Sequence, residues 1–371
     1  MKNGSSSKVW FTDMRVPIGK SLLVKLNQLM KAAGMNSIDF NNKYVAIKMH
    51  FGEKGNLAFL RPNYAKTVVD MVASLGGRPF LTDCSTLYPG ARKNALEHLA
   101  TAFENGFSPL STGCNIIIGD GLKGTDETKV PINGDYVKEA KIGTAIMDAD
   151  IVVSLSHFKG HELTGFGGAI KNIGMGCGSR AGKMEQHSAG KPEIDRELCI
   201  GCGTCLKHCA HNAITLTNKK ASIDQTRCVG CGRCICVCPT NASRPPFDAS
   251  NKDLSCKMAE YAYAVLKDRP HFHVSIIMDV SPYCDCHGEN DAPIIPDVGM
   301  LASFDPVALD QACADAVNRQ TGIAGSILCE RSLTHNDHFT DVHPTTDWHT
   351  CLEHAEKMGI GTRSYELITM K

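Results

Sequence analysis

Half of the chain's eighteen cysteines fall between Cys199 and Cys238, and their spacing repeats. The run C-x2-C-x2-C-x3-C occurs first at Cys199, Cys202, Cys205 and Cys209, and again at Cys228, Cys231, Cys234 and Cys238. Thiolates bind soft metals, and three cysteines spaced by two residues are typical of iron-sulfur cubanes. Zinc sites usually combine C-x2-C pairs with a longer spacer. The pattern therefore favours two [4Fe-4S] clusters, with a pair of zinc sites as the alternative.

The two runs belong to an internal repeat of 29 residues, in which "IDRELCIGCGTCLKHCAHNAI" is echoed by "IDQTRCVGCGRCICVCPTNAS". This segment resembles bacterial-type two-cluster ferredoxins, although Ala210 stands where that family usually has proline. In such ferredoxins the fourth cysteine of each run binds the other cluster. We therefore expect one cluster on Cys199, Cys202, Cys205 and Cys238, and the other on Cys228, Cys231, Cys234 and Cys209. Cys236, between two ligands, is expected to be a packing thiol.

Composition excludes several classes of partner and compartment. Lys plus Arg equals Asp plus Glu at 39 each, so no overall field steers the chain toward nucleic acid, and we expect neither a nucleic-acid nor a membrane partner. The first residues lack an apolar signal core, and the expected location is the cytoplasm. Disulfides are rare in that compartment, which leaves the thiols free for metals.

The rest of the chain predicts an α/β fold. Strands are predicted for the apolar runs at 44–50, 79–84, 115–120, 149–157 and 273–280. Helices are predicted over 62–75, 92–105 and 253–267, and two more are predicted to begin at 305 and 350. The apolar runs are nearly continuous, as in parallel strands covered by helices on both faces. We expect a mostly parallel host sheet over residues 1–190 and 246–371, interrupted by a small α+β ferredoxin-like insert at 191–245.

A stretch from Ser154 to His187, "SLSHFKGHELTGFGGAIKNIGMGCGSRAGKMEQH", follows the end of a predicted strand, where open α/β sheets bind ligands. Glycines in it would let the backbone approach an anion or cofactor, and cations and imidazoles are dense among them. The candidate catalytic residues are His157, His161, Lys171 and His187. The candidate cofactor-binding residues are Gly165, Gly167 and Gly168.

This stretch, together with "KMHFGEKGN", the cysteine repeat and "DVSPYCDCHGENDAPIIPDVGMLASFDPVALDQAC", resembles the uncharacterised Fe-S centre proteins that share domain of unknown function 362. That family brings no general activity. His161, Lys171 and His187 also fall at the spacing of the nickel-ligand and tether residues of nickel-dependent lactate racemases, within a similar "GFGGAIK". The likeness suggests a shared α/β scaffold and pocket location more than a shared cofactor.

Other thiols leave a further metal open. Cys177 lies in the glycine-rich stretch, and Cys284 and Cys286 follow a predicted strand in "YCDCH". Three thiols from two strand ends could converge on a metal or another small-molecule cofactor. Packing in the core is the alternative reading for all three. A nicotinamide fingerprint of strand, G-x-G-x-x-G, helix and acid is absent from the sequence, and a flavin stays open.

Two functions of different kinds follow from these patterns. The first is an electron-transfer protein whose two clusters exchange single electrons with a redox partner protein at an α/β host. The insert carries eight basic and four acidic residues. A docking patch for an acidic redox partner is one interpretation of this excess, and solvated surface side chains are the favoured one. The second is an oxidoreductase that reduces a small anionic substrate or bound cofactor in the His/Lys/Gly-rich pocket. A redox sensor or scaffold is a third reading.

Overall fold

The computed structural model describes residues 6–87, 90–188, 190–331 and 336–370. Its centre is an eight-stranded sheet of order β16-β1-β15-β14-β7-β2-β3-β4. The strands are β1 (Ser7–Asp13), β2 (Tyr44–Lys48), β3 (Arg78–Asp83), β4 (Ile116–Ile118), β7 (Ile151–His157), β14 (His271–Ile277), β15 (Gly299–Ser303) and β16 (Tyr365–Thr369). Strands before and after the cysteine repeat thus pair within one sheet.

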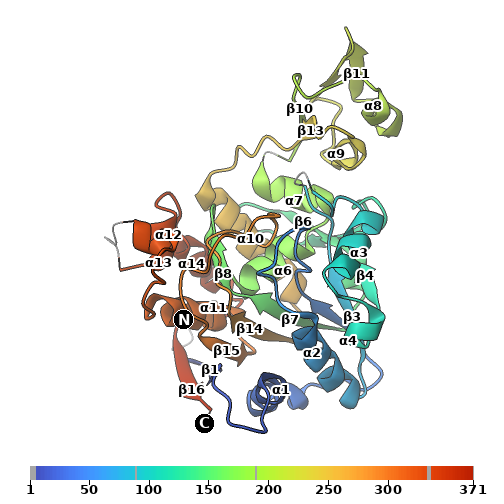
Figure 1. The fold of residues 1–371 in the computed structure, drawn as a ribbon. Helices are drawn as coiled ribbons and strands as arrows, with labels where there is room; N and C mark the ends of the chain where they lie inside the picture. The colour runs from blue at the N-terminus through green and yellow to red at the C-terminus, as the bar shows by residue number, and fades with distance from the viewer. Residues whose placement is uncertain (1–5, 88–89, 189, 332–335, 371) are drawn as a thin grey trace.

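Five of the seven pairings in this sheet are parallel, and only β15 runs antiparallel to its neighbours β1 and β14. The parallel strands β3, β2, β7 and β14 lie side by side, so their carboxyl ends share one edge. Figure 1 shows the loops that follow these strands gathered below the insert. This edge is where a doubly covered parallel sheet binds its ligands.

Helices cover both faces of the sheet, which confirms the predicted fold class. One layer holds α1 (Leu22–Ala32) and α2 (Pro62–Ser74), and the other holds α6 (Ala169–Cys177), α10 (Asn251–Leu266), α11 (Pro306–Asn318) and α14 (His349–Lys357). Within β7, Val152 packs into the second layer's core and Val153 into the first. Strand residues buried on both faces explain why the apolar runs show no alternation.

Most predicted elements agree with the structure to within a few residues. The helix expected at 92–105 begins later, as α3 (Ala95–Glu104), because the Asn94 side chain caps its first turn. The sequence reading did not include the antiparallel hairpin of β5 (Glu127–Pro131) and β6 (Glu139–Gly143). Smaller elements of the host are η1 (Met35–Ser37), α4 (Pro109–Thr112), α5 (Thr144–Met147), β8 (Lys159–His161), β9 (Gly165–Gly167), α7 (Arg180–His187), α12 (Ile327–Glu330) and α13 (His338–Val342).

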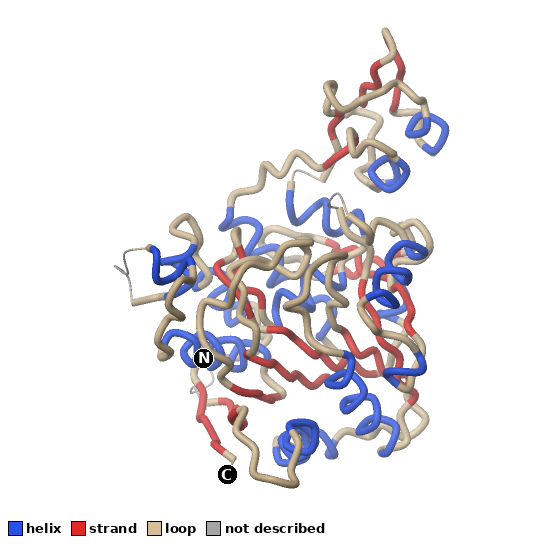
Figure 2. Tube along the Cα trace, viewed as in Figure 1, coloured by secondary structure: helices blue, strands red, loops and turns tan. Residues whose placement is uncertain are grey.

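The cysteine repeat forms a small lobe that stands apart from the host sheet in Figure 1. It contains β10 (Glu193–Ile194), α8 (Thr204–His208), β11 (Ile214–Thr217), β12 (Lys220–Ile223), α9 (Arg233–Val237) and β13 (Ser243–Arg244). Loops make up much of it (Figure 2). Asn218 and Lys219, both at positive φ, form the tight turn between β11 and β12. We call residues 191–245 the insert.

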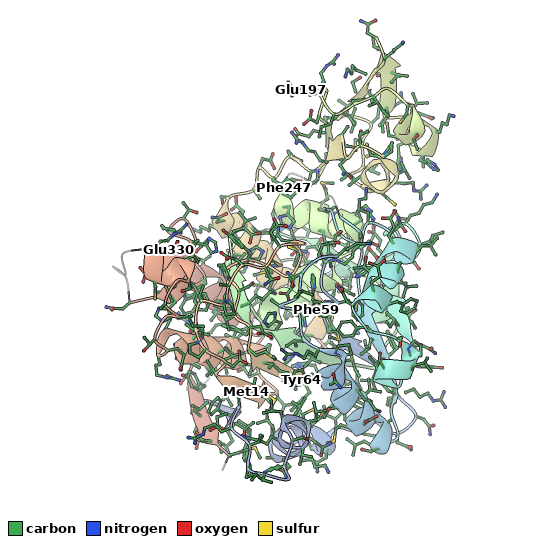
Figure 3. All side chains as sticks on the ribbon, viewed as in Figure 1. Met14, Phe59, Tyr64, Glu197, Phe247 and Glu330 are labelled. Atoms are coloured by element: carbon green, nitrogen blue, oxygen red, sulfur yellow. The ribbon has the colours of Figure 1, made fainter. Side chains whose placement is uncertain are left out.

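Helix α7 of the host packs directly against the insert. Met184 of α7 belongs to the same apolar cluster as Cys199, Cys205, Cys234 and Cys238. Lys93 of the host donates a hydrogen bond of 2.8 Å to Asn241. Figure 3 marks Phe247 where the chain returns to the host, and its ring lies 5.5 Å from that of His187. These contacts hold the insert against α7 and against the loop that precedes α3.

Among the residues that the structure describes, no helix has both the length and the apolar character needed to cross a bilayer.

Candidate functional site

A cavity opens at the carboxyl edge of the sheet; its empty volume, counted together with the open solvent at its mouth, is about 690 Å³. We call it the host cavity. It is lined by residues at or after the carboxyl ends of β2, β3, β7 and β14, and by residues of α6 and α7. The lining includes Lys48, His50, Asp83, Cys84, Thr86, Arg92, His157, Lys159, Gly167, Gly168, Lys171, Asn172, Lys183, Cys284 and Cys286. Five cations thus face a single lining carboxylate, Asp83. The excess of positive charge suits an anionic ligand.

Asp83 holds two of these cations in place. Lys48 Nζ lies 3.0 Å from one of its oxygens, and Arg92 Nη1 lies 3.6 Å from the other. Burial alone would raise the pKa of Asp83, but the Lys48 charge holds it below its usual range. Arg92 also donates a 3.0 Å hydrogen bond to Glu53. Lys48 and Arg92 are thus already paired with carboxylates. The network forms one charged side of the cavity wall.

His157 lines the host cavity, but both of its ring nitrogens are occupied. Nδ1 lies 2.9 Å from Asp285 Oδ2, and Nε2 lies 2.7 Å from the carbonyl oxygen of Met278. Both partners are acceptors, so both hydrogen bonds form only when each nitrogen carries a proton. Lys159 completes the group, with Nζ 3.7 Å from Asp285 Oδ2. In this arrangement His157 anchors the loop after β14 and is not placed to take a proton from a ligand.

Lys171 and Cys284 meet inside the host cavity. Lys171 Nζ donates a hydrogen bond of 3.6 Å to Cys284 Sγ. Lys171 makes no other side-chain hydrogen bond to the described residues. The pKa of Cys284 is held well below its usual value by a hydrogen bond from Cys286 and by the charges of Lys171 and Lys159, which outweigh burial. A thiolate beside an otherwise uncommitted ammonium group is therefore the most reactive feature of the cavity wall.

His161 is fully buried behind this pair, at the end of β8. Its Nδ1 accepts the backbone N–H groups of Leu163, at 3.1 Å, and Thr164, at 3.2 Å. The neutral ring therefore carries its proton on Nε2, and this nitrogen can donate to an anion but offers no lone pair to a metal. His161 is thus a buried hydrogen-bond donor just outside the cavity lining.

His187, at the end of α7, is buried, and its pKa is lowered to about 3 by burial and by the charge of Lys171. The ring is neutral at physiological pH. Unlike Lys171, neither His161 nor His187 is part of the cavity lining.

The three candidate glycines serve the packing of the cavity wall. A Cβ on Gly167 would lie 3.1 Å from Lys159 Nζ, and one on Gly168 would lie 2.3 Å from Asp310 Oδ1. Gly165, at φ +76°, packs against Trp348 and lies outside the lining. Small residues here let β9 and α6 approach charged neighbours.

Asp310 is a positioning residue that the sequence reading missed. Its two carboxylate oxygens accept the N–H groups of Ala169, at 2.7 Å, and Ile170, at 2.9 Å. Helix α6 has no capping side chain of its own, so Asp310 on α11 supplies the cap and fixes the helix that carries Lys171. The two residues lie 139 positions apart in the sequence, and no local pattern links them.

The cysteines of the insert line two separate cavities. The first, with an empty volume of about 340 Å³, is bordered by Cys199, Cys202, Cys205 and Cys238. The second, with an empty volume of about 350 Å³, is bordered by Cys209, Cys228, Cys231 and Cys234. Each cavity therefore takes three cysteines from one run and the last cysteine from the other. Cys236 lines neither.

The surroundings of these thiols suit metal clusters. All eighteen cysteines are free. Backbone N–H groups of Ala221, Ala213 and Gly230 point at the sulfurs of Cys199, Cys209 and Cys228, at 3.4, 3.4 and 3.5 Å. Such N–H···S contacts stabilise the negative charge of an iron-sulfur cluster. The donor set of four thiols and the polar backbone fit a [4Fe-4S] cluster in each cavity.

Arg180 connects the second of these cavities with the host cavity. The side chain is fully buried, and a Cβ on Gly232, which borders the second cavity, would lie 2.7 Å from its Cγ and Cδ. At its other end, Nη1 donates a 2.9 Å hydrogen bond to the carbonyl of Thr86, which lines the host cavity. Burial lowers the pKa of Arg180, and the nearby thiols of Cys236 and Cys234 oppose that shift.

The three cysteines considered for a further metal separate in the structure. Cys177 lies beside Cys84, whose Sγ is 3.5 Å from the Cys177 carbonyl oxygen. Burial raises the pKa of Cys177 to about 11, as expected for a packing thiol. Cys284 and Cys286 remain together in the lining of the host cavity.

Comparison with known proteins places residues 45–315 in the family described as "Domain of unknown function (DUF362)". The chain belongs to this family. A thylakoid-associated protein of Synechocystis sp. is 27% identical over 161 residues, which cover 42% of this chain and 46% of that protein.

Two solved structures are similar at low identity. The lactate racemase apoprotein of Thermoanaerobacterium thermosaccharolyticum has a TM-score of 0.36 at 12% identity, covering 74% of this chain and 51% of the other. A Thermotoga maritima protein has a TM-score of 0.40 at 13% identity, covering 80% and 58%. The chain thus spans about half the length of the relatives that it matches.

Proposed function

We propose that the chain is an iron-sulfur protein that transfers single electrons between a partner protein and its own host cavity. The observation that carries this proposal is the partition of eight cysteines into two cavities, each with three thiols from one run and one from the other. Cys199, Cys202, Cys205 and Cys238 would hold one [4Fe-4S] cluster, and Cys209, Cys228, Cys231 and Cys234 the other. When bound, such clusters supply one-electron redox chemistry.

The two ends of the insert differ in what they contact. Around the first cavity, Cys202 is exposed, and Ile200 beside it is 63% exposed. The second cavity faces the host through Gly232 and Arg180. Because an apolar exposed surface suits a transient protein contact, we propose that the redox partner docks near Ile200. The insert then joins that partner to the host cavity.

Iron analysis and low-temperature EPR of the anaerobically purified chain test this function. The proposal expects about eight iron atoms per chain and, after reduction, the signal of two magnetically coupled cubanes. Zinc without iron, or an oxidised form with disulfides in place of clusters, would end it.

Reduction of a small anion in the host cavity is the second candidate function. The supporting observation is that the described lining of the cavity brings together the cations Lys48, Arg92, Lys159, Lys171 and Lys183 and the carboxylate of Asp83, so that positive charge is in excess. Here Lys171 would bind the anion from the cavity lining, and the paired residues Lys48 and His157 would hold the wall.

Variants of the cavity separate the two candidates. In one assay the reduced chain passes electrons to a soluble dye, and in the other, mass spectrometry identifies small molecules released from the anaerobically isolated protein. If the cavity holds an anion, Lys171→Ala loses the released molecule but keeps electron transfer to the dye. If nothing is released from the wild-type chain and both variants, Lys171→Ala and His161→Ala, transfer electrons normally, only the first function stands.

A further inference from the structure

We propose that Glu162, Cys286 and His287 form a binding site for a divalent transition-metal ion at the edge of the host cavity, separate from the cysteines of the insert. One ligand atom from each residue lies within 4.8 Å of the others. Glu162 follows β8, whereas Cys286 and His287 belong to the loop after β14. The fold therefore brings Glu162 to two adjacent metal-binding side chains that follow it by more than 120 residues in sequence.

The Glu162 carboxylate is incompletely satisfied without a cation. Its Oε1 lies 2.9 Å from His287 Nε2, but its Oε2 is shielded from solvent and has no hydrogen-bond partner in the described part of the chain. A buried carboxylate oxygen without a partner is unfavourable, because it has lost its water and gained nothing in return. A metal ion between Glu162, Cys286 and His287 would satisfy that oxygen.

A neighbouring imidazole supports this carboxylate. His161 Nε2 lies 3.8 Å from Glu162 Oε1, and this nitrogen is also buried and without a hydrogen-bond partner among the described residues. Because His161 Nδ1 accepts two backbone N–H groups, Nε2 bears the proton and cannot be a ligand. A small rotation of the His161 ring would let Nε2–H donate a hydrogen bond to the Glu162 carboxylate. Residues that surround a metal ligand commonly orient it through such a hydrogen bond.

The ligand types select the class of ion. One thiolate, one imidazole and one carboxylate are a borderline set that suits Zn²⁺ and related ions and does not suit Ca²⁺ or Mg²⁺, which prefer oxygen alone. Glu162 brings one negative charge, and Cys286 brings a second when the ion displaces the proton that its thiol donates to Cys284. The nearby ammonium groups of Lys159 and Lys171 are compensated by Asp285 and Cys284. Three protein ligands beside a cavity are typical of a site with an open position.

A second cluster of similar composition shows why ligand types alone are insufficient. Asp135, Glu260 and His354 also lie within 4.8 Å of one another. There, Glu260 accepts the N–H groups of Tyr136 and Val137 as well as His354, and Lys357 pairs with Asp135. Each carboxylate already has donors, so this second group holds α10 and α14 together and leaves no site for a cation.

Zinc binding to the full chain, purified anaerobically with its iron intact, tests the proposal. Zinc is added by equilibrium dialysis, and the zinc X-ray absorption edge reports its ligands. We expect about one zinc per chain, with one sulfur at about 2.3 Å and the remaining neighbours nitrogen or oxygen. Cys286→Ser should remove the sulfur signal, and Glu162→Gln should weaken binding by more than about tenfold. Glu289→Gln, an exposed neighbour of His287, is the matched control and should bind as the wild type does.

Each alternative outcome has a distinct signature. A shell of four sulfurs would place the zinc in the insert and overturn the proposal, as would equal binding by wild type and Cys286→Ser. No zinc binding by the wild type also overturns it. The wild-type spectrum alone decides the case if a variant fails to fold. The proposed electron transfer fails separately, by loss of iron, so the two failures are distinguishable.

Discussion

At the scale of single residues, the structure distinguishes cysteines that the sequence places side by side. Cys236 lies two residues from both Cys234 and Cys238, yet it lines neither of the cavities that those two cysteines border. The same holds in the host, where Cys177 packs beside Cys84 while Cys284 faces Lys171. Which neighbours a thiol has, more than its place in a motif, decides its chemistry.

Substitution of one ligand should remove one cluster. Cys199→Ser takes a thiolate from the first cavity, and we expect iron to fall from about eight to about four atoms per chain. Cys236→Ser is the matched control and should retain the wild-type iron content. Anaerobic iron analysis of the two variants checks this prediction. Equal loss of iron in both would contradict the assignment of Cys236 as a packing thiol.

At the scale of elements, the position of Lys171 depends on the cap that α11 gives to α6. Asp310→Ala leaves two buried N–H groups without acceptors and should destabilise the fold by about 2 kcal/mol. It should also weaken retention of any anion that Lys171 holds. Gln311→Ala, the neighbouring substitution on the same helix, is the control. Thermal unfolding under anaerobic conditions measures the difference, and equal midpoints for the two variants would refute the cap's importance.

The contact between α10 and α14 should depend on pH. Hydrogen bonds to Cys256 and Glu260 raise the pKa of His354 to about 9, above its ordinary value of 6.5. The folded state therefore binds the proton more tightly than the unfolded state does, so the stabilisation is complete below about pH 6.5 and is lost as the pH rises through about 9. His354→Gln should lower the unfolding midpoint at pH 6 and have little effect at pH 10. An effect of equal size at both values would contradict this account.

At the scale of the whole molecule, the joint between insert and host includes α7, whose Met184 and Arg180 contact the insert. The repeat offers a matched pair to test this joint, because Gly203 and Gly232 are equivalent positions with φ of +73° and +66°. A Cβ on Gly203 meets nothing within 4 Å, whereas one on Gly232 meets the buried side chain of Arg180. Both substitutions strain the backbone, but only one disturbs the joint.

Gly232→Ala should therefore loosen the docked insert more than Gly203→Ala does. We expect faster hydrogen exchange in α7 and slower electron transfer to an acceptor bound in the host cavity. Hydrogen exchange of the two anaerobic variants is the measurement. If α7 exchanges equally fast in both, Arg180 does not hold the insert in place.

Local spacing and composition were sufficient to predict the α/β class and the position of His157 at the end of a strand, because these features depend on neighbours within one strand or helix. Asp310 and the pairing of Glu162 with His287 could not be predicted, because each depends on contacts between residues over 100 positions apart. The partners that restrict the role of His157, Asp285 and Met278, come from a distant loop and could not be predicted either.

Anomalous diffraction at the iron edge, from crystals of the anaerobically purified chain, tests the central claim most directly. The account predicts two separate iron peaks, one bonded to Cys199, Cys202, Cys205 and Cys238 and the other to Cys209, Cys228, Cys231 and Cys234. Iron bound by the four cysteines of a single run, or no iron at either place, would contradict it.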